Sequence, residues 1–182
     1  MKKSQLDHVL RAARRITGEA QFIIVGSQSL HATHPDVPDT IARSIEVDLI
    51  ARNERARTEW LNVIGVDSPF HESFGYYADP VDENTAILPR GWESRLVRLG
   101  PGDTEGAIGL CLDPHDLAIS KYAARREKDI VFNREMAKLG IVGRERLLEL
   151  LAVTLLSDER RAAIRAHIDA DFANNRDRPG FS

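Results

Sequence analysis

The sequence predicts an α/β protein: a mixed sheet flanked by helices, followed by a helical C-terminal third. Two observations carry this prediction. Up to residue 112, helical apolar spacing repeatedly gives way to short apolar or alternating runs typical of strands, whereas the rest of the chain shows helical patterns. With 182 residues, 42% of them hydrophobic, the chain can bury one compact core that carries a helical appendage.

The N-terminal part is predicted to contain two helices with a strand between them. Residues 5–16 repeat apolar side chains at helical spacing. Residues 21–25 are a short apolar run that fits a buried strand. Gly26-Ser27 then turns the chain into a second helical stretch, which ends before the next proline.

The middle of the chain is predicted to supply most of the sheet. Residues 44–51 alternate, so Ile45, Val47 and Leu49 are expected to face the core while the residues between them face away. A helix is expected at residues 52–64. Further short strands are expected at residues 75–78, 85–88, 95–99 and 108–112.

The C-terminal part is predicted to be helical. Asp113-Pro114 begins it with an N-cap aspartate and a proline at the first helical position. The expected helices cover residues 114–127, 129–139, 144–156 and 158–173. The predicted organisation is an α/β core at residues 1–112, a helical region packed on it at residues 113–174, and a flexible tail at residues 175–182.

Composition excludes several classes of protein. The formal net charge is −3, so no global electrostatic footprint for nucleic acid is present, although a local basic patch is compatible with it. The single cysteine, Cys111, lies in an apolar run and is expected to be a buried thiol; it can form neither an intramolecular disulfide nor a thiolate-rich zinc site. No stretch approaches the roughly 20 apolar residues of a membrane helix, which predicts no membrane partner and a cytoplasmic location.

Two short motifs suit a site for phosphate and metal. Gly26 allows close backbone approach to a phosphate, and Ser27 offers a hydroxyl at a helix N-terminus, which favours anions. Glu46 and Asp48 share one face of a strand about 7 Å apart, and such hard oxygen ligands can bind one or two magnesium ions. Taken alone, each motif is also typical of an ordinary turn or of a solvated strand face.

A third motif places cations on a predicted helix. Lys121, Arg125 and Lys128 recur at i, i+4 and i+7, with Asp129 near the same stripe. Such a stripe can hold a polyphosphate, although an ordinary charged surface helix has the same pattern.

Together the three motifs resemble the nucleotidyltransferase superfamily of the DNA polymerase beta type. Within it, the chain is most similar to the bacterial toxin-like nucleotidyltransferases related to the AbiEii abortive-infection proteins, and to short proteins beside them. Those share Gly-Ser-Gln, acidic-x-Asp and Asp-Leu-x-x-Ser-Lys-x-x-Ala-x-Arg-x-Lys-Asp patterns. The matching residues here are Gly26, Ser27, Gln28, Glu46, Asp48, Asp116, Leu117, Ser120, Lys121, Ala124, Arg126, Lys128 and Asp129.

The resemblance implies a nucleotidyltransferase-type mixed sheet and a reaction. A nucleotidyl group would pass from an NTP to an acceptor hydroxyl on RNA, protein or a small molecule, with Mg²⁺ or Mn²⁺ as the cofactor. The toxin-like relatives suggest tRNA or a protein as the acceptor and a cognate antitoxin as a further partner.

Roles are carried over residue by residue. The implied nucleotide contacts are Gly26, Ser27, Gln28, Lys121, Arg125, Arg126 and Lys128. The implied catalytic residues are Glu46, Asp48, Lys121 and Asp129, where Asp129 would either order the basic residues or join the catalytic cluster. The implied metal ligands are Glu46, Asp48 and a third carboxylate, Asp79, with Asp82 as the alternative.

Two departures from the superfamily pattern keep other interpretations open. Glu46 stands where aspartate is usual, and neither Asp79 nor Asp82 lies in a clean alternating strand. One alternative is a catalytically inactive member that binds a nucleotide or a partner. The other is an interaction protein of a toxin–antitoxin pair that docks through its C-terminal helices.

Overall fold

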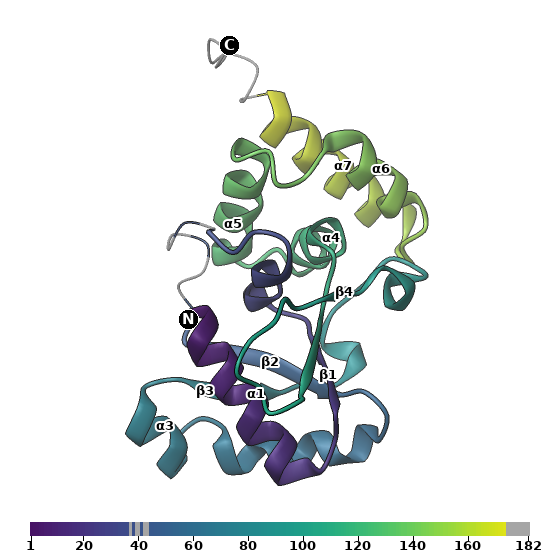
Figure 1. Ribbon diagram of the computed structural model, residues 1–182. Helices are drawn as coiled ribbons and strands as arrows, with labels where there is room; N and C mark the ends of the chain where they lie inside the picture. The colour runs from purple at the N-terminus through teal and green to yellow at the C-terminus, as the bar shows by residue number, and fades with distance from the viewer. Residues whose placement is uncertain (37, 39–40, 42–43, 174–182) are drawn as a thin grey trace. The chain divides into compact units, whose positions relative to one another are not determined.

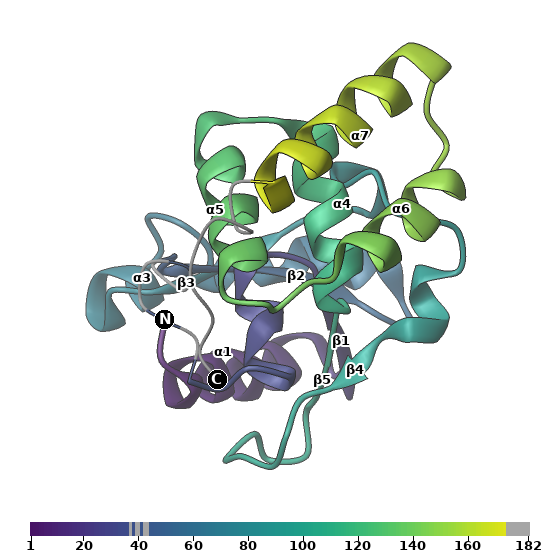
Figure 2. The same ribbon diagram turned by 90° about the horizontal axis from the view of Figure 1, so that it is seen from above.

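A computed structural model of the chain describes residues 1–36, 38, 41 and 44–173. Within these residues, five strands form one mixed sheet in the order β3-β2-β1-β5-β4 (Figures 1 and 2). The β1–β2 and β4–β5 pairs are antiparallel, whereas the β1–β5 and β2–β3 pairs are parallel. The strands are β1 Gln21–Ile24, β2 Glu46–Ala51, β3 Tyr77–Pro80, β4 Val97–Arg98 and β5 Ile108–Cys111. The predicted α/β class, with a mixed sheet and a helical C-terminal part, is confirmed.

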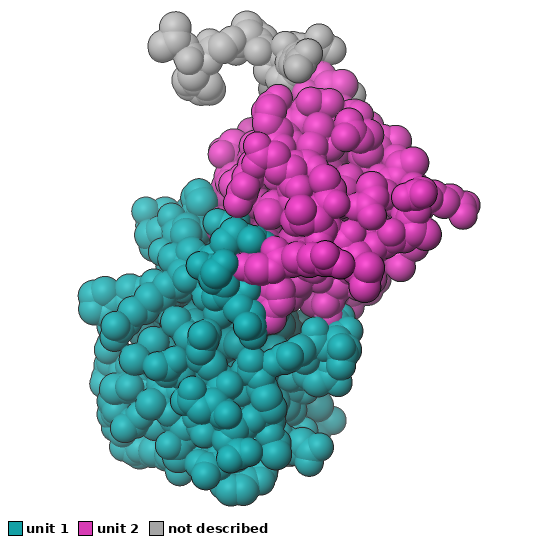
Figure 3. Space-filling view, turned by 90° about the vertical axis from the view of Figure 1, so that its right-hand side faces the viewer, with its two compact units in different colours: residues 1–85, 93–113 teal, residues 86–92, 114–182 magenta. Residues whose placement is uncertain are grey.

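The chain divides into two compact units, which Figure 3 distinguishes by colour. Residues 1–85 and 93–113 form unit 1, which contains the sheet; residues 86–92 and 114–182 form unit 2. The predicted tail at residues 175–182 lies outside the described residues. Besides the strands, the described residues of unit 1 contain the α-helices α1 Lys3–Thr17 and α3 Pro69–Phe74. They also contain 3₁₀ helices, written η: η1 Ser27–Ala32, η2 Arg55–Ile64 and η3 Glu83–Thr85, while η4 Trp92–Arg95 begins at the unit boundary.

Helix α1 covers one face of the sheet (Figure 1). Its buried residues Leu6, Leu10 and Ala13 pack against strand residues that point to this face, namely Phe22, Ile24, Val47, Leu49 and Ala51. Burying one such aliphatic side chain contributes about 1.5–3 kcal/mol. Because side chains alternate along a strand, this packing commits Glu46 and Asp48 to the opposite face.

Unit 2 is a group of helices, which Figure 2 shows from above. Its helices are α4 Pro114–Ala124, α5 Glu127–Lys138, α6 Arg144–Ala152 and α7 Asp158–Ala173. Leu117, Phe132, Leu147 and Ile164 contribute one buried apolar side chain from each helix. Across the described part of the chain, no helix is both long and apolar enough for a membrane crossing.

Several predicted elements are wrong in detail. Residues 85–88 form no strand; instead Pro89 makes an isolated bridge to Thr154, which joins the 86–92 segment to unit 2. Ile45 is 49% exposed and outside the core because β2 begins at Glu46. Helix α6 ends at residue 152 rather than 156.

Helix α3 was not predicted, although its start signal is present in the sequence. The Ser68 side chain accepts the His71 N–H, and Pro69 occupies the first turn. The helix has six residues, too short for a recognisable apolar period.

Candidate functional site

The glycine turn and the acidic strand meet at one end of the sheet. Gly26 follows β1, and β2 runs antiparallel to β1, so the beginning of β2 lies beside the end of β1. The Val25 N–H donates to the Asp48 carbonyl at 3.2 Å. We predict from the convergence of the two motifs that these segments are neighbours in one mixed sheet, and their pairing confirms it.

The Asp48 side chain fills the space that a side chain at position 26 would need. A Cβ built on Gly26 would lie 1.7 Å from Asp48 Oδ2 and 2.8 Å from its Cγ. The backbone of Gly26 is extended, with φ −92°, so any residue could adopt its conformation. Position 26 therefore requires glycine for steric reasons, because the Asp48 carboxylate lies where a Cβ would be.

Asp79 joins this end of the sheet from the neighbouring strand. Strand β3 pairs parallel with β2, with Glu46 opposite Tyr77 and Asp48 opposite Asp79. Cross-strand partners are roughly 4.8 Å apart and point to the same face. Sequence alternation around Asp79 is weak, yet the residue lies in register with Asp48. Asp82 is exposed beyond the strand, where its Oδ1 accepts the Asn84 N–H at 2.6 Å.

The charges of these side chains shift the pKa values of their neighbours. Burial, and then the charge of Glu46, raise the pKa of Asp79. Burial, a hydrogen bond to Glu46 and the nearby charges of Glu46, Asp79 and Asp48 raise the pKa of Tyr77 to about 12. Negative charge is therefore concentrated at this end of β2 and β3, where a cation would relieve it.

We expect Asp79→Asn to raise the melting temperature of the metal-free protein at neutral pH. The folded-state pKa of Asp79 lies above its unfolded value, so its ionised form penalises folding; the penalty is absent well below about pH 4 and complete above the folded-state pKa. The gain in melting temperature should therefore vanish in acid, and Mg²⁺ should diminish it by stabilising the wild type. Thermal scans across pH, with Asp82→Asn as the control, measure it. An equal gain in melting temperature at all pH values would contradict the raised pKa of Asp79.

The donor set suits a hard divalent cation. Among the described residues, no three His, Cys, Asp or Glu side chains stand together as a preformed metal site. Magnesium is commonly held by one or two protein carboxylates, with water and substrate phosphates completing its shell. Glu46, Asp48 and Asp79 offer carboxylate oxygens of this kind on adjacent strands.

The residues after Gly26 have different surroundings. Ser27 is half-buried at the start of η1, a helix of six residues with a smaller dipole than the full helix that was expected. Gln28 is 1% exposed, and its Nε2 donates to the Ser44 carbonyl at 3.0 Å. Gln28 thus braces the segment before β2, and its geometry gives no support to the predicted nucleotide contact.

The basic motif does not lie on one helix. Helix α4 ends at Ala124, and Arg125 adopts a left-handed conformation with φ 53°. Helix α5 then begins at Glu127. The predicted i, i+4, i+7 stripe is therefore wrong, because the break rotates Lys128 away from the register of Lys121.

The break instead folds the motif around Asp129. This carboxylate is 0% exposed; it lies 3.1 Å from Lys121 Nζ and 2.8 Å from Arg126 Nε. Burial raises the pKa of Asp129, but Arg126 and Lys121 outweigh burial and lower it overall. Lys121 Nζ also lies 4.3 Å from the Phe132 ring centroid. These contacts are compatible with the predicted ordering role of Asp129, while Arg125 and Lys128 are exposed.

These residues belong to unit 2, whereas the acidic residues belong to unit 1. Their convergence on one site stays a prediction.

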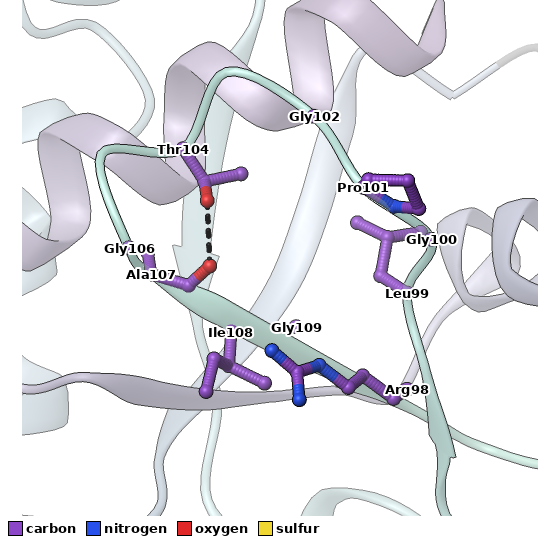
Figure 4. A pocket seen from close by; sticks show the side chains of 10 residues that line it. All are labelled: Arg98, Leu99, Gly100, Pro101, Gly102, Thr104, Gly106, Ala107, Ile108 and Gly109. Carbon is purple, nitrogen blue, oxygen red and sulfur yellow. Dashed lines mark hydrogen bonds between the residues drawn. The ribbon is translucent and has the colours of Figure 1, made fainter.

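A hollow in unit 1 lies away from the acidic residues. It has a volume of about 540 Å³ and is formed by the loop that joins β4 and β5 (Figure 4). This loop is fastened to α1, where Arg11 pairs with Asp103 and Arg15 with Glu105. Because Gln21 pairs with Ile108 at the start of both parallel strands, the hollow lies at the end of the sheet opposite Gly26. Its lining contains no carboxylate, so it does not suit a metal-nucleotide complex.

The topology and the acidic sheet end define a class: an α/β protein that brings carboxylates from adjacent strands beside a glycine turn. A protein-family profile described as "Nucleotidyltransferase of unknown function (DUF6036)" matches residues 4–170, so the chain belongs to this family. No curated protein and no solved structure gives a significant match. The nucleotidyltransferase resemblance is confirmed, whereas the AbiEii and DNA polymerase beta likenesses stay predictions.

Proposed function

We propose that the protein is a metal-dependent nucleotidyltransferase that moves a nucleotidyl group from an NTP to an acceptor hydroxyl. One observation carries the proposal: Gly26 leaves its side-chain space to the carboxylate of Asp48, which lies in register with Asp79. A glycine turn beside paired carboxylates brings a phosphate-binding backbone and hard oxygen ligands to one place.

Each residue has a role in the proposed reaction. The carboxylates of Glu46, Asp48 and Asp79 would hold the cation. A bound Mg²⁺ or Mn²⁺ would neutralise the triphosphate and lower the pKa of the attacking hydroxyl. Ser27 would donate its hydroxyl to a phosphate oxygen. Lys121 would contact the triphosphate, as the resemblance implies, and its ammonium group forms an ion pair with Asp129.

The acceptor and the biological role extend the proposal. The resemblance to toxin-like nucleotidyltransferases supports tRNA or a protein as the acceptor, rather than a small molecule. It also supports a toxin-like role with a cognate antitoxin.

Labelled nucleotides test the proposed reaction. The purified protein is titrated with each NTP by calorimetry, with Mg²⁺ and with EDTA, and is then incubated with cell extract and NTPs labelled at the α- or the γ-phosphate. Nucleotidyl transfer retains the α label and releases the γ label with pyrophosphate. Magnesium-dependent binding without incorporation would favour the inactive member, and the absence of NTP binding would favour the interaction protein.

Lys121→Ala should weaken NTP binding by about 1.5–3 kcal/mol, the usual contribution of a charged hydrogen bond. The fold should survive because Arg126 still pairs with the buried Asp129. Lys138→Ala, which removes an exposed cation paired with Glu135, is the control. Equal NTP affinity of wild type and Lys121→Ala would remove Lys121 from the site.

A further inference from the structure

We propose that Tyr77 is a positioning residue that holds the Glu46 carboxylate for the divalent cation. The inference rests on the proposed function and deepens it, because the resemblance assigns no role to Tyr77. It also accounts for a glutamate at a position where the superfamily usually has aspartate.

A direct contact carries the proposal. Tyr77 and Glu46 are cross-strand partners in β3 and β2, and the Tyr77 hydroxyl donates to Glu46 Oε2 at 2.9 Å. An ionised carboxylate can only accept, so the direction of this bond is fixed by chemistry. With Oε2 held by the phenol, Oε1 would be the oxygen left for the cation. Residues that hydrogen-bond to metal ligands in this way set ligand orientation and strengthen metal binding.

The length of glutamate explains why a partner is needed. Glu46 carries one more methylene than aspartate and therefore one more rotatable bond. Fixing a free glutamate side chain costs conformational entropy, because each rotatable bond loses its freedom. A hydrogen bond from a neighbouring strand restricts the carboxylate before the cation arrives, so less of that cost falls on cation binding.

The Tyr77 ring is itself held in place by helix α3. The His71 ring lies 4.6 Å from the Tyr77 ring, centroid to centroid. His71 Nδ1 accepts the Asp67 N–H at 3.2 Å, which orients the imidazole. Ser68 caps α3 and anchors this turn. The phenol therefore approaches Glu46 from a ring that is packed on one side.

The chain contains a matched control next to Tyr77. Tyr76 also carries a bonded hydroxyl, but it lies 2.8 Å from His8 Nδ1 and belongs to the core on the α1 side of the sheet. Tyr76 and Tyr77 are adjacent in sequence, but their side chains lie on opposite faces of the sheet. Tyr77→Phe and Tyr76→Phe each remove a phenolic hydroxyl and keep the aromatic ring. If loss of a bonded tyrosine hydroxyl disturbs the fold in general, both variants should show the defect.

The experiment is a calorimetric titration with Mn²⁺ alone, without nucleotide. The proteins are wild type, Tyr77→Phe, Tyr76→Phe, Glu46→Gln and the Glu46→Gln/Tyr77→Phe double variant, each checked by circular dichroism. We expect Tyr77→Phe to weaken Mn²⁺ binding about tenfold or more, as losses of such supporting hydrogen bonds do. Tyr76→Phe should bind like wild type. Tyr77→Phe should have no further effect once Glu46 is glutamine, because it acts through that carboxylate.

Three results would overturn the proposal, and they differ in what they leave of the proposed function. If Glu46→Gln weakens Mn²⁺ binding but Tyr77→Phe does not, or if Tyr77→Phe has its full effect without the Glu46 carboxylate, Tyr77 does not position Glu46 and the proposed function stands. If wild type and Glu46→Gln behave alike toward Mn²⁺, Glu46 is not a ligand. That result removes the role of Tyr77 and takes Glu46 out of the proposed ligands, whereas the proposed function would then rest on Asp48 and Asp79.

Discussion

Asp48→Asn should leave the protein folded and lower magnesium-dependent nucleotidyl transfer by about 10²–10³-fold. The expected loss corresponds to several kcal/mol of metal-assisted charge stabilisation, at about 1.4 kcal/mol for each factor of ten. Asparagine keeps the volume of aspartate but removes the charge of a hard-cation ligand. Strand β2 should persist, because Val47 and Leu49 still fill the core and β2 has a paired strand on each side.

Incorporation of α-labelled NTP measures this effect, with circular dichroism as the check on folding. Asp82→Asn is the control, since Asp82 is exposed beyond β3 and caps a turn with an oxygen that asparagine retains. Equal incorporation by wild type and folded Asp48→Asn would rule out Asp48 as a metal ligand.

Gly26→Ala should also cause a large loss of nucleotidyl transfer. The cause is steric, because the added methyl group displaces the Asp48 carboxylate without removing its charge. The new Cβ would overlap Asp48 Oδ2, a distance no structure tolerates, so the carboxylate must rotate away. The clashing atoms belong to a side chain that can turn, and the backbone of residue 26 is extended, so the fold should tolerate the change. Transfer should approach the level of Asp48→Asn, because the same carboxylate is removed from its position.

Gly100→Ala is the matched control for this substitution. It adds the same methyl group in unit 1, where nothing lies within 4 Å of the new Cβ. The Gly26→Ala/Asp48→Asn double variant supplies the second comparison: its transfer rate should equal that of Asp48→Asn alone, since both act through one carboxylate. Additive losses, or full activity of Gly26→Ala, would contradict this account.

The convergence of Gly26 with Glu46 and Asp48 was predictable because each motif follows a simple local rule. A glycine at the end of an apolar run marks a turn, and alternation in residues 44–51 puts both carboxylates on one face. The buried face of β2 was predictable for the same reason, apart from Ile45 at the strand's margin.

Other parts of the site depend on contacts that a local pattern does not contain. The register of Asp79 with Asp48 comes from the pairing of β3 with β2, and β3 has only four residues. Spacing offered one signal: Tyr77 and Asp79 are two apart, like Glu46 and Asp48. The contact of Gln28 was equally hidden, because its partner is a backbone carbonyl sixteen residues away.

The interruption at Arg125 was hidden from sequence by the lack of glycine or proline. A left-handed conformation at a non-glycine residue costs roughly 1–2 kcal/mol, so helical continuation was the expected outcome. The paired cations around buried Asp129 offset that cost.

The loop between β4 and β5 gives this protein a convenient place for a reporter. It stands at least one strand length from the carboxylates, roughly 13 Å for the four residues of β1. Gly100 on this loop is exposed, and a side chain there meets nothing. A cysteine introduced at that position could be labelled selectively, because burial raises the pKa of the Cys111 thiol to about 12 and keeps it unreactive. A fluorophore on the loop would then follow NTP or acceptor binding by anisotropy without touching the groups assigned to chemistry.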